Sequence, residues 1–327
     1  MAQLSTADRI GSLRTTPGLV ERIDFPRRVV FVAAASMIGI VVLLLAFIAM
    51  QGLQLFIKDG ASVGEVLSPT WQPDSGSGAT NFGLLPFIAG TLLVTAVALL
   101  ISTPLSVGLA VFLSEVAPDW AKAGVQPALE IFVGIPSVVW GWLGLTILVP
   151  FLADTFHNKI SLGLPVVGTL FSMPGFLTGF SWLAGSLVLS VMILPTITSV
   201  SFDAFRAVPR ELRTGSLALG TTRWQTIRHI LVPAALPGVL TAVVLGMTRA
   251  AGEALAVQMV IGNSPTMPAA FTQPVTTLTS QITLDMGNTV FGEPWQDALW
   301  TMSLVLQVIT VASVVLVRLL NKRRQAS

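Results

Sequence analysis

The sequence holds little that could perform covalent or metal chemistry. Cysteine is absent from the 327 residues, which excludes disulfides, thiolate metal sites and a cysteine nucleophile. The two histidines, His157 and His229, are too few for a histidine-based metal centre. None of the four lysines follows a glycine, so the phosphate-binding loop of a nucleotide site is missing. We therefore expect no catalytic residue, no metal and no cofactor in this chain.

Charged residues are also scarce. They make up 10% of the sequence, whereas hydrophobic residues make up 53% and the mean hydropathy is +0.80. A soluble domain usually carries about 25% charged residues. This composition indicates that lipid is the solvent and predicts an all-α polytopic membrane protein. With a net charge of only +2, we expect no nucleic-acid partner.

Six apolar segments reach the length of about 20 residues that a membrane-spanning helix needs. Basic residues are absent from these segments, apart from Arg249 in the fifth and Arg318 at the end of the sixth. Gly141 and Gly144 in the third segment predict close helix contacts there, and Pro136 predicts a kink. The predicted spans are 29–50, 84–113, 129–152, 178–200, 237–262 and 298–319.

The distribution of Lys and Arg gives the orientation, because basic residues collect on the cytoplasmic side. With a cytoplasmic N-terminus, fifteen of the eighteen basic residues lie inside and only Lys58 and Lys159 lie outside. Both termini are therefore predicted to be cytoplasmic. The predicted organisation is a tail at 1–28, a transmembrane domain at 29–320 with a cytoplasmic loop at 201–236, and a tail at 321–327.

Three outer loops are expected, at 51–83, 153–177 and 263–297. Residues 160–177 are apolar but broken by proline and glycine, and the charge rule argues against a seventh span there. We interpret them as an external loop or a re-entrant piece packed on protein. The outer loops are either hydrophilic connectors or a docking face for an external partner, and their length leaves both interpretations open.

The cytoplasmic loop predicts a helix, a turn and a second helix. Pro209 suits a first helical position, Gly220 suits a helix stop, and Thr222 with Gln225 has the spacing of a capping box. Pro233 and Pro237 are expected to end the second helix. Trp224, Ile227 and Leu231 fall on one face of that helix. Such a helix either lies on the lipid surface or inserts into a groove of a cytoplasmic partner.

This loop resembles the coupling loop of ATP-binding-cassette importer permeases. Gly220, followed after nine residues by Ile230-Leu231-Val232-Pro233, matches the second half of the family pattern. The Glu-Ala-Ala triplet of the first half is replaced by Thr214-Gly215-Ser216, and Glu211 lies one turn earlier. The resemblance implies contact with an ATPase subunit. The residues it assigns to this coupling are Gly220, Thr222, Trp224, Ile227, Ile230, Leu231 and Pro233.

The predicted fifth span contains Arg249 and Glu253, which are four residues apart and would share one face of a helix. A charged group in the middle of a bilayer costs about 2.5–3.5 kcal/mol on insertion scales. The pair is either a structural salt bridge or part of an ion path. In the second case Arg249 meets an anion, because its planar fork matches oxyanions, and Glu253 balances it.

The same stretch resembles the phosphate-specific permeases of the PstC type. The motifs that carry the resemblance are Arg249-Ala250-Ala251-Gly252-Glu253, Ile261-Gly262-Asn263, and the run Gly134 to Gly141 preceded by Glu130. It covers roughly residues 85–320. It implies a type I ABC importer permease fold and roles for Arg249 and Glu253 in phosphate passage. Glu130, at the start of the third span, is either an interfacial carboxylate or a third charge on the path.

The resemblance implies a permease subunit of an inorganic phosphate importer in the cytoplasmic membrane, forming half of the pathway. It implies a second related permease, two ATPase subunits that bind ATP and Mg, and an extracytoplasmic phosphate-binding protein. Another oxyanion, such as sulfate, molybdate or a phosphonate, is the first alternative, because an arginine distinguishes tetrahedral oxyanions poorly. A proton-driven secondary carrier is the second, although the halves show no convincing repeat.

Overall fold

A computed structural model describes residues 17–73, 80–155 and 178–325. The chain divides into two compact units, residues 1–51 and 52–327. The first unit consists mainly of helix α2 (Pro17–Gly52), which begins earlier than the predicted span at 29–50. The predicted segment 160–177 lies outside the described residues.

The described residues contain six helices that are long and apolar enough to cross a membrane, which confirms the predicted number. The second and sixth agree with the predicted spans within four residues. The first and fourth end later than predicted, at Ile57 and Arg206 in place of 50 and 200, and the third and fifth differ as described below. The six are Arg27–Ile57, Leu85–Val116, Ser137–Asp154, Trp182–Arg206, Arg223–Ala251 and Pro294–Leu319.

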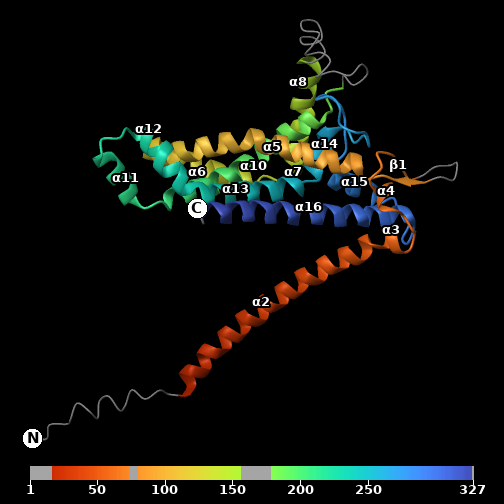
Figure 1. Cartoon of the computed structure of the whole chain (residues 1–327), viewed down its shortest axis with the longest axis horizontal. Coiled ribbons are helices and arrows are strands. Elements are labelled where there is room, and N and C mark those ends of the chain that lie inside the picture. Colours follow the sequence, from red (N-terminus) through yellow and green to blue (C-terminus); the bar gives the residue numbers. More distant parts are fainter. Residues whose placement is uncertain (1–16, 74–79, 156–177, 326–327) are drawn as a thin grey trace, which may run out of the picture. The chain divides into compact units, whose positions relative to one another are not determined.

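The second unit is a helical bundle built around α10 (Trp182–Arg206). Helix α10 packs against α5 (Leu85–Val111) and α13 (Val232–Ala251), and α13 also contacts α16 (Pro294–Gln325). Figure 1 shows α11 (Arg210–Ala218) and α12 (Arg223–Thr226) at one end of this bundle, and α4 (Val63–Val66) and α15 (Leu278–Asp285) at the other.

The third span differs from the prediction. Helix α6 (Asp119–Gly134) ends before Pro136, and α7 (Ser137–Leu143) begins after it. Ile135 and Pro136 have extended ψ angles of 127° and 139°, so the helix is interrupted here and not merely kinked as predicted. Proline disfavours helical geometry in the residue before it, which explains the break. The span continues through η2 (Gly144–Leu148), a π-helical turn, into α8 (Val149–Asp154).

The fifth span was also predicted wrongly at both ends. The second helix of the cytoplasmic loop does not stop at Pro233 or Pro237, because α12, the π-helical η4 (Ile227–Leu231) and α13 follow one another without a break. Pro233 lies in the first turn of α13, where its missing N–H is tolerated after the π turn. The helix ends at Ala251, and α14 (Leu255–Ile261) follows the link 252–254.

The outer side carries short elements. Helices α3 (Gln54–Ile57) and α4 are followed by a small antiparallel pair, β1 (Trp71–Gln72) and β2 (Asn81–Phe82). The Nζ atom of Lys58 lies 2.9 Å from Oδ2 of the buried Asp297, which ties the end of α3 to the start of α16.

Part of the third outer loop is buried. Residues 270–281 are buried, except for the half-buried Phe271. The Trp182 indole nitrogen donates to the Ala270 carbonyl at 2.6 Å, and the Leu278 amide donates to the Thr91 hydroxyl at 2.9 Å. Residues 270–281 are therefore not available to a docking partner, whereas Met267, Val290 and Phe291 of the same loop are exposed.

The predicted close contact at Gly141 is confirmed. A Cβ atom at Gly141 would lie 2.8 Å from the Met259 sulfur and 2.9 Å from Cα of Ala256, both on α14. We expect Gly141→Ala to lower stability by about 1–3 kcal/mol, the usual cost of overpacking. Thermal unfolding of the purified chain in detergent would measure this. Gly134→Ala, where a Cβ meets nothing within 4 Å, is the matched control. Equal melting temperatures for both variants would contradict the packing at this contact.

Candidate functional site

Arg249 lies in the last turn of α13 and is half-buried. Its Nη1 donates to the Thr196 hydroxyl of α10 at 3.0 Å. Among the described residues, no carboxylate lies within salt-bridge distance of its guanidinium. The carbonyls at the end of α13 provide partial negative charge that favours a cation there. Since a guanidinium carries five N–H donors, most of them stay available to an oxyanion.

Glu253 does not share a helix face with Arg249, which corrects the sequence prediction. It lies in the link after α13 and is half-buried. Its Oε1 accepts from the Ala256 amide at 3.4 Å, so the side chain faces the start of α14. Its backbone carbonyl accepts from the Thr279 hydroxyl at 2.8 Å. The predicted ion pair with Arg249 is therefore not formed, and Glu253 joins α13, α14 and α15.

Glu130 does not begin the third span. It is exposed on α6, four residues before that helix ends at Gly134. Among the described residues, no hydrogen bond or ion pair links it to Arg249 or Glu253. The three predicted charges are thus not in direct contact with one another in the part of the chain that the structure describes.

The cytoplasmic hairpin has the local structure that the sequence predicts. Helix α11 stops before Gly220, which has a φ of +82°, a value that glycine adopts without strain. Thr222 caps α12, and Thr222 and Gln225 form the complete capping box. Hydroxyl oxygens of Ser216, Thr221 and Thr226 lie within 3.1 Å of one another and fix the turn. Pro209 is the N-cap of α11, one position before the predicted one.

The residues that the resemblance assigns to coupling separate into a buried and an exposed group. Ile227 and Leu231 are buried in a cluster with Leu113, Phe205 and other side chains of α5, η1 (Phe112–Val116) and α10. Ile230 is half-buried. The exposed residues are Gly220, Thr222, Trp224 and Pro233. The structure therefore places Trp224 on a different face from Ile227 and Leu231, contrary to the sequence prediction.

The tip of the hairpin exposes large apolar side chains. Leu219 is 87% exposed and Trp224 is 66% exposed, and Leu212 and Leu217 are also exposed. Exposed apolar patches of this kind mark interaction sites. Sequence analysis selected Trp224 but missed the three leucines, because only the folded turn shows that they point away from the permease.

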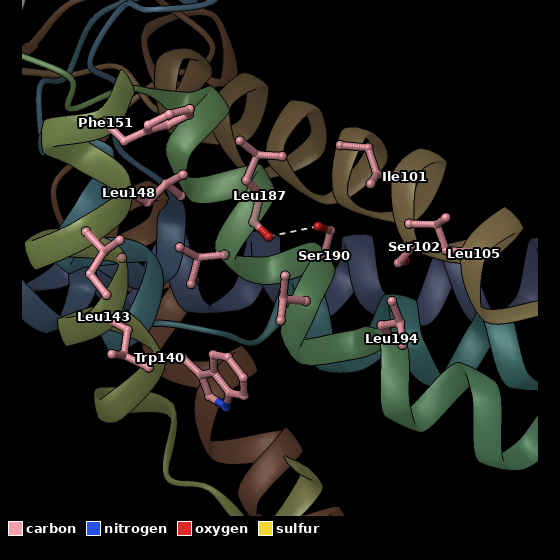
Figure 2. A pocket seen from close by; sticks show the side chains of 14 residues that line it. Ile101, Ser102, Leu105, Trp140, Leu143, Leu148, Phe151, Leu187, Ser190 and Leu194 are labelled. Carbon is pink, nitrogen blue, oxygen red and sulfur yellow. Dashed lines mark hydrogen bonds between the residues drawn. The ribbon is translucent and has the colours of Figure 1, made fainter. Parts of the chain in front are cut away.

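A groove of about 520 Å³ between α5, α7 to α8, and α10 is almost entirely apolar (Figure 2). Its walls include Leu105, Leu143 and Phe151, and the Ser190 hydroxyl on its lining donates to the Leu187 carbonyl. None of the described residues that line it is charged. It therefore offers no positive charge to an oxyanion, and Arg249 is not among its lining residues.

Six candidate spans, a cytoplasmic hairpin with an apolar tip and an arginine inside the fifth span define a membrane-embedded permease. Residues 102–326 match the family described as binding-protein-dependent transport system inner membrane component. The chain is 48% identical over 300 residues to the probable ABC transporter permease protein YqgH of Bacillus subtilis, with 91% of each chain covered. It is 37% identical over 259 residues to the phosphate transport system permease protein PstC of Xylella fastidiosa, with 78% of each covered. The chain belongs to this family of ABC transporter permeases, among the relatives of PstC.

A solved bacterial ABC transporter that imports the polysaccharide alginate shares the fold. The TM-score is 0.58, the identity is 17%, and the match covers 92% of this chain and 99% of that chain. Together with the family, this likeness shows a type I importer permease fold in a multi-pass protein of the cytoplasmic membrane. The chain is a transport subunit, and its class works with an ATPase in separate subunits and with a binding protein.

Proposed function

We propose that this chain is the permease subunit of an ATP-driven importer of inorganic phosphate and forms half of the translocation pathway. The observation that carries the proposal is Arg249, a half-buried guanidinium in a membrane span that has no carboxylate partner among the described residues. Relatives at 34–37% identity over about four fifths of the chain carry the name phosphate transport system permease protein, which supports phosphate as the cargo.

In this proposal Arg249 meets the anion in a transient cavity. The Thr196 hydroxyl holds one edge of the guanidinium, and the remaining donors face the phosphate oxygens. Glu253, at the break after α13, limits how tightly the anion is held, because a transport path needs a site that the ion also leaves. We retain Glu130 as a third charge on the path, one helical turn before the break between α6 and α7.

The proposed assembly pairs the chain with a second, related permease and two ATPase subunits, which bind ATP and Mg. An extracytoplasmic phosphate-binding protein delivers the anion to the outer face. The exposed tip around Leu219 and Trp224 is the surface offered to the ATPase. Ile227 and Leu231 anchor the same helix in the permease, and η4 and α13 continue it without a break to Arg249.

The cargo is tested by uptake of radiolabelled phosphate into vesicles that hold the complete complex, with unlabelled sulfate, molybdate or a phosphonate as competitors. We expect unlabelled phosphate to compete and the other three oxyanions not to compete at equal concentration. Little phosphate uptake, together with uptake of one of the other oxyanions when that oxyanion carries the label, would assign it as the cargo. The family of binding-protein-dependent systems gives no support to a proton-driven carrier.

Thr196 provides a smaller test of the same site. Thr196→Val removes the hydroxyl that receives the Arg249 N–H but keeps the shape of the side chain. Because a hydrogen bond to a charged group contributes about 1.5–3 kcal/mol, we expect uptake to fall by roughly 10-fold or more. Thr196→Ser keeps the hydroxyl and is expected to retain most uptake. Equal uptake by both variants would mean that Thr196 does not orient Arg249.

A further inference from the structure

Arg213 of α11 is the most extensively bonded arginine among the described residues. Its Nη2 lies 3.0 Å from Oε1 of Glu115, and its Nε lies 3.3 Å from the same oxygen. Its Nη1 donates to the Val208 carbonyl and its Nη2 to the Phe205 carbonyl, each at 2.6 Å. One guanidinium therefore joins the hairpin to η1 and to the end of α10.

The partners of Arg213 lie in three separate segments: η1, the end of α10, and the link 207–209 between α10 and α11. Glu115 lies in η1, the π-helical turn that continues α5. Phe205 is in the last turn of α10, and its carbonyl accepts from the Val208 amide at 3.3 Å as well as from Arg213. The apolar cluster that includes Leu113, Phe205, Ile227 and Leu231 connects the same segments. The polar joint and the apolar cluster thus connect the same three parts.

Burial makes this ion pair different from a surface one. The Arg213 and Glu115 side chains are 21% and 14% exposed. Exposed pairs contribute little, whereas loss of one partner from a buried pair leaves an uncompensated charge. Lys122 and Asp119 on α6 form such an exposed pair, at 3.8 Å and with Asp119 fully accessible. The chain thus offers a matched comparison on the same side of the membrane.

We propose that Arg213 and Glu115 are positioning residues for coupling: they make the hairpin move as one body with the cytoplasmic ends of α5 and α10. A movement of the hairpin tip is then transmitted to the helices that carry Thr196 and Arg249. The proposal rests on the ATP-driven import proposed above. Glu211, which is exposed on α11, takes no part in this joint, so the acidic partner comes from η1 and not from the hairpin.

The test uses the complete complex in vesicles and compares Glu115→Gln, Arg213→Lys and the double variant with wild type. Glu115→Gln removes the charge, and Arg213→Lys keeps the charge but loses the planar fork. Phosphate uptake and ATP hydrolysis are measured in the same samples. We expect each single variant to lower the ratio of uptake to hydrolysis by about fivefold or more, the lower range of coupling between sites. Asp119→Asn, the matched control, should leave the ratio unchanged.

The double variant should be no worse than the poorer single one, because the pair is already broken. A wild-type ratio in assembled single variants, or fully additive losses, would overturn the proposal. Hydrogen exchange of the wild-type complex tests it without any substitution. Residues 112–117 and 205–231 should change protection together when ATP is added, and independent changes would overturn the proposal. Absence of phosphate uptake in wild type would instead contradict the proposed cargo, and the hydrogen-exchange result would still stand.

Discussion

Replacing Arg249 with alanine is expected to reduce phosphate uptake by about 10- to 150-fold in vesicles that hold the complete complex. The estimate follows from the loss of charge-assisted hydrogen bonds worth about 1.5–3 kcal/mol. Arg249 lies at the end of α13, half-buried and bonded to Thr196, so its loss removes the positive charge of α13 without opening a packed core. Uptake of radiolabelled phosphate is the measurement, with the amount of assembled complex determined in the same vesicles.

Two further variants separate charge from assembly. Arg249→Lys keeps a positive charge but replaces the planar guanidinium, which can donate two parallel hydrogen bonds, with a compact ammonium. We therefore expect intermediate uptake. Arg206→Ala removes an exposed arginine from the last turn of α10, where its guanidinium lies 5.5 Å from the Phe202 ring. This control should retain uptake. Full uptake by Arg249→Ala would make Arg249 a structural residue of α13.

Truncating the hairpin tip should detach the ATPase. The double substitution Leu219→Ala and Trp224→Ala removes the two most exposed apolar side chains of the turn. Buried tryptophan anchors at interfaces contribute about 2–4 kcal/mol, so we expect ATPase affinity to fall by roughly 30-fold or more. Titration of the purified ATPase onto the permease in lipid nanodiscs would measure this.

Trp120→Ala is the matched control for the tip. Trp120 is an exposed tryptophan of α6, outside the hairpin. Its loss should leave ATPase affinity unchanged. The tip substitutions should leave the stability of the permease unchanged, because the Leu219 and Trp224 side chains are exposed. Unchanged ATPase binding by the tip variant would show that another cytoplasmic surface carries the contact.

The spans could be predicted from the sequence because a bilayer imposes a minimum length of apolar helix. The effect of each proline on where a span begins or ends could not be predicted. Pro136 separates α6 from α7, whereas Pro233 and Pro237 lie within a helix that runs from Arg223 to Ala251. The difference depends on local bonding. A π turn precedes Pro233, and no pattern in the sequence predicts such a turn.

The site was predicted in part. Arg249 stood out because a charge in an apolar span is costly. Its partner Thr196 did not, since a threonine in α10 looks like any other half-buried residue. Glu253 was assigned to a helix that ends before it. The pair Arg213 and Glu115 was missed for a third reason. The two residues are 98 positions apart, and only the packing of η1 against the hairpin brings them together.

The most direct test of the central claim is ATP-dependent phosphate uptake by the complete wild-type complex in sealed vesicles. Radiolabelled phosphate would be supplied with its binding protein on the outer side, and ATP on the side of the hairpin. Uptake that requires ATP hydrolysis and survives collapse of the proton gradient is the predicted result. Uptake that persists without ATP and disappears with the gradient, or no phosphate uptake at all, would contradict the account.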